Sequence, residues 1–122
     1  MANRYRGEIA AELDGRQWTL CLTLGALAEL EPVFGAADLA DLASRLGSGR
    51  LTATQMTAIL AAGLRGGGHD VSESEVAAMH CPQGLAGMAR IVADLVGATF
   101  GAGEPAPRRG NAPANPSRPL ED

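Results

Sequence analysis

Four side chains in this sequence are of the types that bind metals or act as nucleophiles: Cys21, His69, His80 and Cys81. His80 and Cys81 are adjacent, the other two are remote in sequence, and no Cys-x-x-Cys or His-x-x-x-His spacing occurs. A nucleophilic Cys–His pair also needs a third group that orients the base, and the sequence indicates none. We therefore predict no catalytic, cofactor-binding or metal-binding residues.

Two other patterns admit a chemical interpretation, and both favour a plainer one. A Gly-Gly-Gly-His-Asp run at 66–70 follows a predicted helix, whereas a phosphate-binding P-loop follows a strand and carries Gly-Lys-Ser/Thr. We interpret this run as a linker between helices. Glu29 and Glu31 lie two apart on a predicted helix, so they point to different faces and form a poor acid–base pair. We expect them to be solvated or to face a partner.

The charge balance argues against nucleic acid as a partner. The chain has a formal net charge of −4, all its basic residues are arginine, and it has no basic stripe. Phosphate contacts need clustered Lys or Arg. A helix-turn-helix over 52–80 is a further alternative, but its second helix begins with Glu73 and Glu75, which do not suit a DNA groove. We therefore expect no binding to nucleic acid.

Length and hydropathy predict one small domain in the cytoplasm. The chain has 122 residues, which suffice for a single domain. No apolar run reaches the ~18 residues of a membrane span, and the first residues lack the apolar core of a signal peptide. We expect no membrane contact and two reduced cysteines. Because aromatic residues are scarce, the core must be thin and aliphatic, and we expect apolar surface to be available to a partner.

The first structural element is a predicted β-hairpin around Asp14-Gly15. A two-residue Asp-Gly loop favours a type I′ turn, which needs a positive φ at both positions. A turn at these two residues predicts the cross-strand pairs Leu13–Arg16, Ala11–Trp18 and Ile9–Leu20. In this register the apolar side chains of both strands share one face, and register and pattern therefore agree.

Five short helices are predicted after the hairpin, from apolar spacing and capping signals. They cover Leu24–Glu31, Asp38–Leu46, about 53–65, about 73–80 and roughly Gln83–Phe100. The first follows the N-cap Thr23 and is expected to end or kink at Pro32. The third and fourth follow capping boxes, at 52–55 and 72–75.

The apolar positions of the longer helices predict the core, and the end of the chain has none. The expected core positions are Met56, Ile59, Leu60 and Leu64, then Leu85, Met88, Ala89, Val92, Leu95 and Val96. From residue 101, five of the seven prolines fall in a segment too polar to order itself. The sequence thus predicts an α+β, mainly α fold. It has an N-terminal hairpin and about five helices over 1–100, and a disordered Pro-rich tail over 101–122.

Three segments carry a family resemblance. They are Arg6-Gly-Glu through Leu27-Ala-Glu-Leu-Glu31, Gly-Arg-Leu-Thr at 49–52, and Leu64-Arg-Gly-Gly-Gly-His-Asp-Val-Ser72. Together they resemble the gene transfer agent family of small tail proteins, among the phage tail assembly chaperones encoded just before the tape measure protein. The resemblance covers most of residues 5–100, and its motifs are structural rather than catalytic.

The resemblance implies a non-enzymatic chaperone that coats the long apolar helices of the tape measure protein until tail tube subunits polymerise around it. The expected partners are the tape measure protein and the tail tube protein, and self-association is left open. The expected contacts are the exposed hairpin edge and the Leu24, Leu27 and Leu30 face, flanked by Glu29 and Glu31. The alternatives are a structural subunit of the tail or virion and a generic helical protein–protein adaptor. An enzyme is the weakest alternative.

Overall fold

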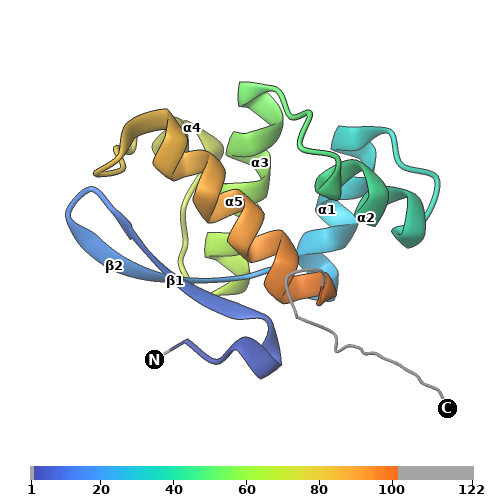
Figure 1. The fold of residues 1–122 in the computed structure, drawn as a ribbon, viewed down its shortest axis with the longest axis horizontal. Helices are drawn as coiled ribbons and strands as arrows, with labels where there is room; N and C mark the ends of the chain where they lie inside the picture. The colour runs from blue at the N-terminus through green and yellow to red at the C-terminus, as the bar shows by residue number, and fades with distance from the viewer. Residues whose placement is uncertain (1, 102–122) are drawn as a thin grey trace, which may run out of the picture.

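The fold is a two-stranded hairpin covered by five helices, as the sequence predicts. The computed structural model describes residues 2–101, and the predicted Pro-rich tail lies outside the described residues apart from its first residue. The elements are a 3₁₀ turn η1 (Arg4–Arg6), β1 (Glu8–Leu13), β2 (Arg16–Cys21), α1 (Leu24–Phe34), α2 (Leu39–Gly47), α3 (Ala53–Gly66), α4 (Glu73–Ala77) and α5 (Gly84–Phe100). The helices lie on one side of the hairpin, and α5 runs diagonally in front of α3 (Figure 1).

The predicted hairpin register is confirmed pair by pair. β1 and β2 run antiparallel with Leu13 opposite Arg16, Ala11 opposite Trp18 and Ile9 opposite Leu20. The turn residues Asp14 and Gly15 have φ values of 55° and 75°, which a type I′ turn requires. The inward-facing side chains of both strands are buried. Local turn chemistry and alternation are therefore sufficient to define this part of the fold.

Helix α3 is the centre of the core. All its side chains from Ala58 to Leu64 are buried, and the helix contacts α1, β2, α4 and α5. The two strands pack mainly on different helices: β2 packs on α3, and β1 packs on α5. The largest completely buried side chains come from every layer: Leu13, Leu20, Leu30, Leu42, Ile59, Leu64 and Leu95. One aliphatic core thus joins the hairpin to the helices.

Side-chain caps mark the starts of the first four helices, each within one residue of the predicted position. Thr23 and Asp38 accept hydrogen bonds from the third backbone N–H of α1 and α2. Both capping boxes are complete, with Thr52 and Gln55 bonding reciprocally before α3, and Ser72 and Glu75 before α4. Each cap satisfies backbone donors that a helix start leaves unpaired.

The expected end of the first helix at Pro32 is wrong, because α1 continues through it to Phe34. The proline lies in the last turn, where its fixed φ suits the helix and only one backbone bond is lost. Gly35 then ends the helix at φ 64°, and the N–H of Ala36 donates to the carbonyl of Glu31. The continuation brings the Phe34 ring into the core.

One other helix end differs clearly from the prediction. Helix α4 ends at Ala77 rather than near His80, because the chain turns there to meet the hairpin tip. The N–H of Asp14 donates to the His80 carbonyl over 2.8 Å, and the N–H of His80 donates to Asp14 Oδ1 over 2.9 Å. We call this reciprocal pair the tip latch.

Some predicted core positions are not buried. Leu85 is 82% exposed in the first turn of α5, although it lies on the same angular face as Val92, which is buried. Ala89 is also exposed, and Met56 and Met88 are partly buried. Periodicity therefore gives the face of a helix but not how far along it the neighbours extend. Within residues 2–101, no helix is long and apolar enough to cross a membrane.

Candidate partner-binding surface

The structure separates the residues expected to bind a partner. Leu24 is 75% exposed at the start of α1, but Leu27 and Leu30 are only 6% and 1% exposed. The apolar face of α1 packs against α3 and α2, so these two leucines belong to the core and are not available on the surface. The expectation that they form partner contacts is corrected accordingly.

The two glutamates of α1 also have different surroundings. Glu29 Oε1 pairs with Arg65 Nη2 at 2.6 Å, and Arg65 also donates to the carbonyl of Val71. Glu29 therefore ties α1 to the end of α3, through a largely exposed pair that contributes little stability. Glu31 forms no ion pair within the described part of the chain. Partner binding by Leu24, Glu29 and Glu31 stays a prediction.

The glycine run at 66–70 does more than link two helices. Gly66 and Gly67 lie against the outer edge of β2, where a Cβ would collide with the backbone carbonyl oxygens of Cys21 and Thr19 respectively. The end of α3 can approach the strand only because these positions have no side chain. Two residues after Gly67, the His69 ring packs edge-on against the Trp18 ring at 4.8 Å between centroids. This run therefore closes one side of the hairpin.

A mostly apolar groove of about 350 Å³ lies between α5 and the segment that joins α2 to α3. Glycines, alanines and larger apolar side chains line it: Leu46, Gly47, Gly49, Leu51, Met56, Ala89, Val92, Ala93, Val96 and Gly97. No charged side chain lines it. We call it the helical groove, and its chemistry suits apolar side chains presented by a partner.

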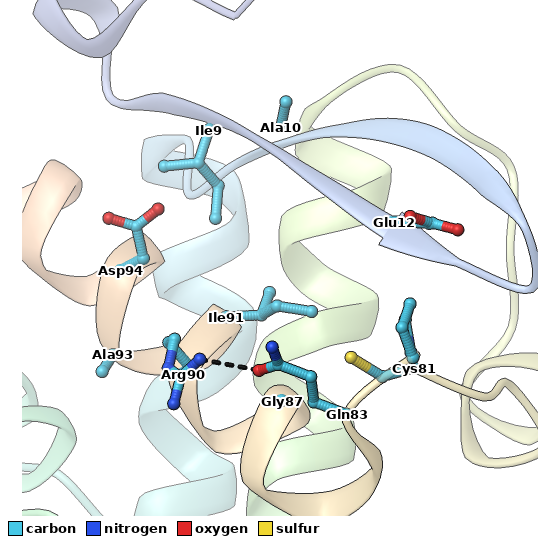
Figure 2. A pocket seen from close by; sticks show the side chains of 11 residues that line it. Ile9, Ala10, Glu12, Cys81, Gln83, Gly87, Arg90, Ile91, Ala93 and Asp94 are labelled. Atoms are coloured by element: carbon cyan, nitrogen blue, oxygen red, sulfur yellow. Dashed lines mark hydrogen bonds between the residues drawn. The ribbon is translucent and has the colours of Figure 1, made fainter.

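A second, more open groove of about 750 Å³ lies between β1 and α5. Figure 2 shows Ile9, Ala10 and Glu12 of β1 on one side, with Ile91 and Asp94 of α5 on the other. Its remaining lining comes from Cys81, Pro82, Gln83, Gly87, Arg90 and Ala93. We call it the strand groove.

The strand groove depends on one glycine inside α5. A Cβ at Gly87 would collide with Cys81 Sγ, so glycine lets the segment before α5 fold back against the helix. Arg90 Nη1 donates to Gln83 Oε1 over 2.6 Å and closes that end of the groove (Figure 2). Neither groove was identified from the sequence, because each joins segments that are far apart in the chain. The interior glycine of α5 was the available signal.

The cysteines and histidines do not assemble into a reactive site. Burial raises the pKa of the Cys21 thiol, the Glu8 carboxylate raises it further, and Arg6 partly offsets both. A raised pKa keeps Cys21 in its less nucleophilic thiol form. Cys81 is also a free thiol and lines the strand groove. Among residues 2–101, no three His, Cys, Asp or Glu side chains are grouped closely enough to hold a metal ion.

Comparison with known proteins identifies the family. The sequence model of the family described as "Phage tail tube protein, GTA-gp10" matches residues 6–102. The match spans the hairpin and all five helices. The chain therefore belongs to this family and is a gene transfer agent or phage tail protein. No curated protein and no solved structure matches it.

Proposed function

We propose that this chain, as a member of that family, is a non-enzymatic tail assembly chaperone that binds the tape measure protein before the tail tube forms around it. The helical groove is the observation that carries the proposal. A chaperone of this kind must cover the apolar side chains of long helices, and the groove offers a surface of matching chemistry. The family membership supplies the context of tail assembly.

The lining of the helical groove suits a helix as its occupant. Its lining includes Gly47, Gly49 and Gly97, which have no side chain, and the small side chain of Ala89. Small residues allow close approach of a partner backbone, so that large apolar side chains of the partner can reach the larger apolar residues of the lining, such as Leu51. A helix presents such side chains at spacings of three and four residues. One turn or two of an amphipathic helix would fill a hollow of this size.

The charges indicate that apolar burial drives this binding. Because no charged side chain lines the helical groove, moderate salt should weaken the complex little. A complex held by phosphate contacts would respond strongly to salt. Salt dependence thus separates binding in the groove from nonspecific charge attraction.

A structural role in the tail is the second candidate. The family description contains the words "tail tube protein", which favour a subunit that remains in the particle. The helical groove would then be an interface between subunits. The two roles differ in one observable, because a chaperone is absent from finished particles and a subunit is present in stoichiometric amounts.

Co-expression with the tape measure protein of the same gene cluster tests the proposal. The chaperone role predicts that the tape measure protein stays soluble and co-purifies with this chain at low and high salt. Ala89→Arg places a charge in the helical groove and should abolish co-purification. Ala86→Arg makes the same change at an exposed position of α5 outside both grooves, and is the matched control.

A second probe concerns the start of α1. A charge at Leu27 would unfold the core, so the informative substitution is Leu24→Asp at the exposed position. A loss of binding with an unchanged circular dichroism spectrum would add α1 to the binding surface. If the tape measure protein fails to bind while this chain is found stoichiometrically in particles, the structural role replaces the chaperone role.

A further inference from the structure

The outer edge of β1 has free backbone N–H and C=O groups in its middle, and the directions of two carbonyls on β2 show which groups these are. In an antiparallel pair, successive residues direct their N–H and C=O alternately toward and away from the partner strand. The carbonyls of Thr19 and Cys21 face α3, away from β1. Their partners across the ladder, Ala10 and Glu8, must therefore direct their own backbone groups away from β2.

Both ends of this outer edge are already occupied. The N–H of Glu8 donates to the Asn3 carbonyl over 3.0 Å. At the other end, the N–H of Asp14 donates to His80 within the tip latch. Between them, the outward N–H and C=O groups of Ala10 and Glu12 have no hydrogen-bond partner within residues 2–101. The open edge is therefore short and bounded at both ends.

The open edge lies along the strand groove. Ala10 and Glu12 both line that groove, and Ile91 and Cys81 provide apolar surface below them (Figure 2). A row of unpaired donors and acceptors is complementary only to another extended backbone. An added strand would direct alternate side chains into the groove and toward solvent. The groove side would be apolar, and the solvent side would lie next to the Glu12 carboxylate.

Charge determines which extended segment fits. The Glu12 carboxylate is exposed and forms no ion pair or hydrogen bond within the described chain, while Glu8 lies on the same face of β1. Pairing of two copies of β1 brings acidic side chains together in each register. With Ala10 opposite Glu12 the two Glu12 side chains are diagonal, and with Ala10 opposite Ala10 Glu8 faces Glu12. Like charges at these positions destabilise a ladder, whereas opposite charges stabilise it.

We propose that the β1 edge binds an extended segment of a partner protein by strand addition, with apolar side chains over the strand groove and basic side chains beside Glu12. This site is separate from the helical groove and does not depend on the chaperone role. It gives the chain two different kinds of binding surface, one for a helix and one for a strand. The edge contributes main-chain affinity, and the groove and Glu12 contribute selectivity.

Amide exchange measured by NMR tests the proposal. The probe is a disulfide-cyclised hairpin peptide that presents Arg-Val-Arg-Val-Arg as a free edge strand, because cyclisation reduces the ordering cost. The full chain is used in the free form and with the peptide in excess. When the peptide is bound, the exchange rates of the Ala10 and Glu12 amides should fall by about tenfold or more. Unchanged exchange at these two amides at the highest peptide concentration would overturn the proposal.

Charge reversal gives the second measurement. Glu12→Arg should lower the affinity for the basic peptide by about fivefold and raise the affinity for the Glu-Val-Glu-Val-Glu counterpart. Asp70→Arg makes the same charge change in an exposed loop outside the strand groove and should leave both affinities as in the unmodified chain. Equal binding of both peptides to all three proteins would overturn the charge selectivity. A concentration-dependent dimer that protects the same amides without peptide would assign the edge to self-pairing instead.

Discussion

The two edges of the hairpin are treated differently by the rest of the chain. The outer edge of β2 is closed by the end of α3, whose Gly66 and Gly67 lie directly against the strand backbone. The outer edge of β1 instead faces an open groove. Within residues 2–101, the outward backbone groups of Ala10 and Glu12 have no hydrogen-bond partner, whereas both ends of the edge are hydrogen-bonded. A two-stranded sheet is marginal by itself, so at least one edge or face must be supported. Here β2 contributes mainly to stability, and β1 keeps an edge available for binding.

The glycines account for much of this difference. Backbone-to-backbone approach at β2 requires the absence of side chains at the end of α3, and the chain provides glycine at both contact positions. At β1 the helix that lies nearest is α5, and the space between them is left open. Substitutions on the β2 side should therefore change stability most, and those on the β1 side should change thiol reactivity and partner binding.

The largest effect is expected at Trp18, on the inner face of β2. Its ring packs against His69, lies under the Arg16 guanidinium at 4.2 Å, and donates from Nε1 to the carbonyl of Leu13 over 2.9 Å. Trp18→Ala should lower the free energy of unfolding by about 3–5 kcal/mol. Chemical denaturation measures this change, and Trp18→Phe, which keeps a ring but loses the bond, should cost less. A loss below about 1 kcal/mol for the alanine variant would contradict the assigned packing.

The next effect is expected at Gly67, which makes the closest approach to Thr19. Gly67 has φ −82°, so alanine is conformationally acceptable there and any cost is steric. Gly67→Ala should destabilise the protein by about 3 kcal/mol, since a backbone carbonyl cannot move aside as a side chain can.

Gly47→Ala is the matched control, because no neighbouring atom limits a Cβ at that helical position. This variant should be unchanged or stabilised by up to about 1 kcal/mol, as expected from helix propensity. Equal melting behaviour of the Gly67 and Gly47 variants would show that the β2 edge is not closed in the way described.

A smaller effect is expected at the tip latch, which bounds the open edge of β1. Asp14 has a positive φ and accepts the N–H of His80 through Oδ1. Asp14→Ala should cost about 1–2 kcal/mol, through the lost hydrogen bond and the unfavourable backbone conformation. Asp14→Asn retains an acceptor and tolerates a left-handed conformation, so its stability should stay within about 0.5 kcal/mol of the unmodified chain. Thermal unfolding of both variants measures these changes, and equal losses would show that the latch depends on the carboxylate charge.

Most of the fold could be predicted from the sequence because its signals are local. The Asp-Gly turn, the alternation of the strands and the caps at Thr23, Thr52 and Ser72 each involve residues within a few positions of one another. The passage of α1 through Pro32 was not predictable in this way, since the burial of Phe34 and the cap at Gly35 together outweigh one lost backbone bond.

The candidate surfaces were less predictable, and the reason is their distance along the chain. The strand groove joins residues 9–12 to residues 81–94, and its shape depends on Gly87. The apolar spacing of Leu27 and Leu30 correctly indicates a buried face, but it does not tell whether this chain or a partner covers it. A single sequence therefore gives the apolar faces of helices more readily than the surfaces that remain after they pack.

The smallest effect compares the two free cysteines, one beside each edge. Cys21 lies at the end of β2, where burial and the nearby Glu8 raise the pKa of its thiol and its Sγ lies 3.6 Å from the carbonyl of Arg6. Cys81 lines the open strand groove. Because the thiolate is the reactive form, a raised pKa slows alkylation of Cys21 at neutral pH and lets it accelerate only as the pH rises toward that pKa.

Iodoacetamide labelling followed by peptide mass spectrometry should therefore modify Cys81 first near pH 7, about threefold faster or more. Binding of the basic hairpin peptide should slow labelling of Cys81 and leave Cys21 unchanged, because only Cys81 lies in the groove that the added strand covers. Cys81→Ser serves as the control that assigns the remaining label to Cys21. Equal protection of both thiols by the peptide would indicate a global change rather than occupation of one edge, and the contrast between β1 and β2 would then fail.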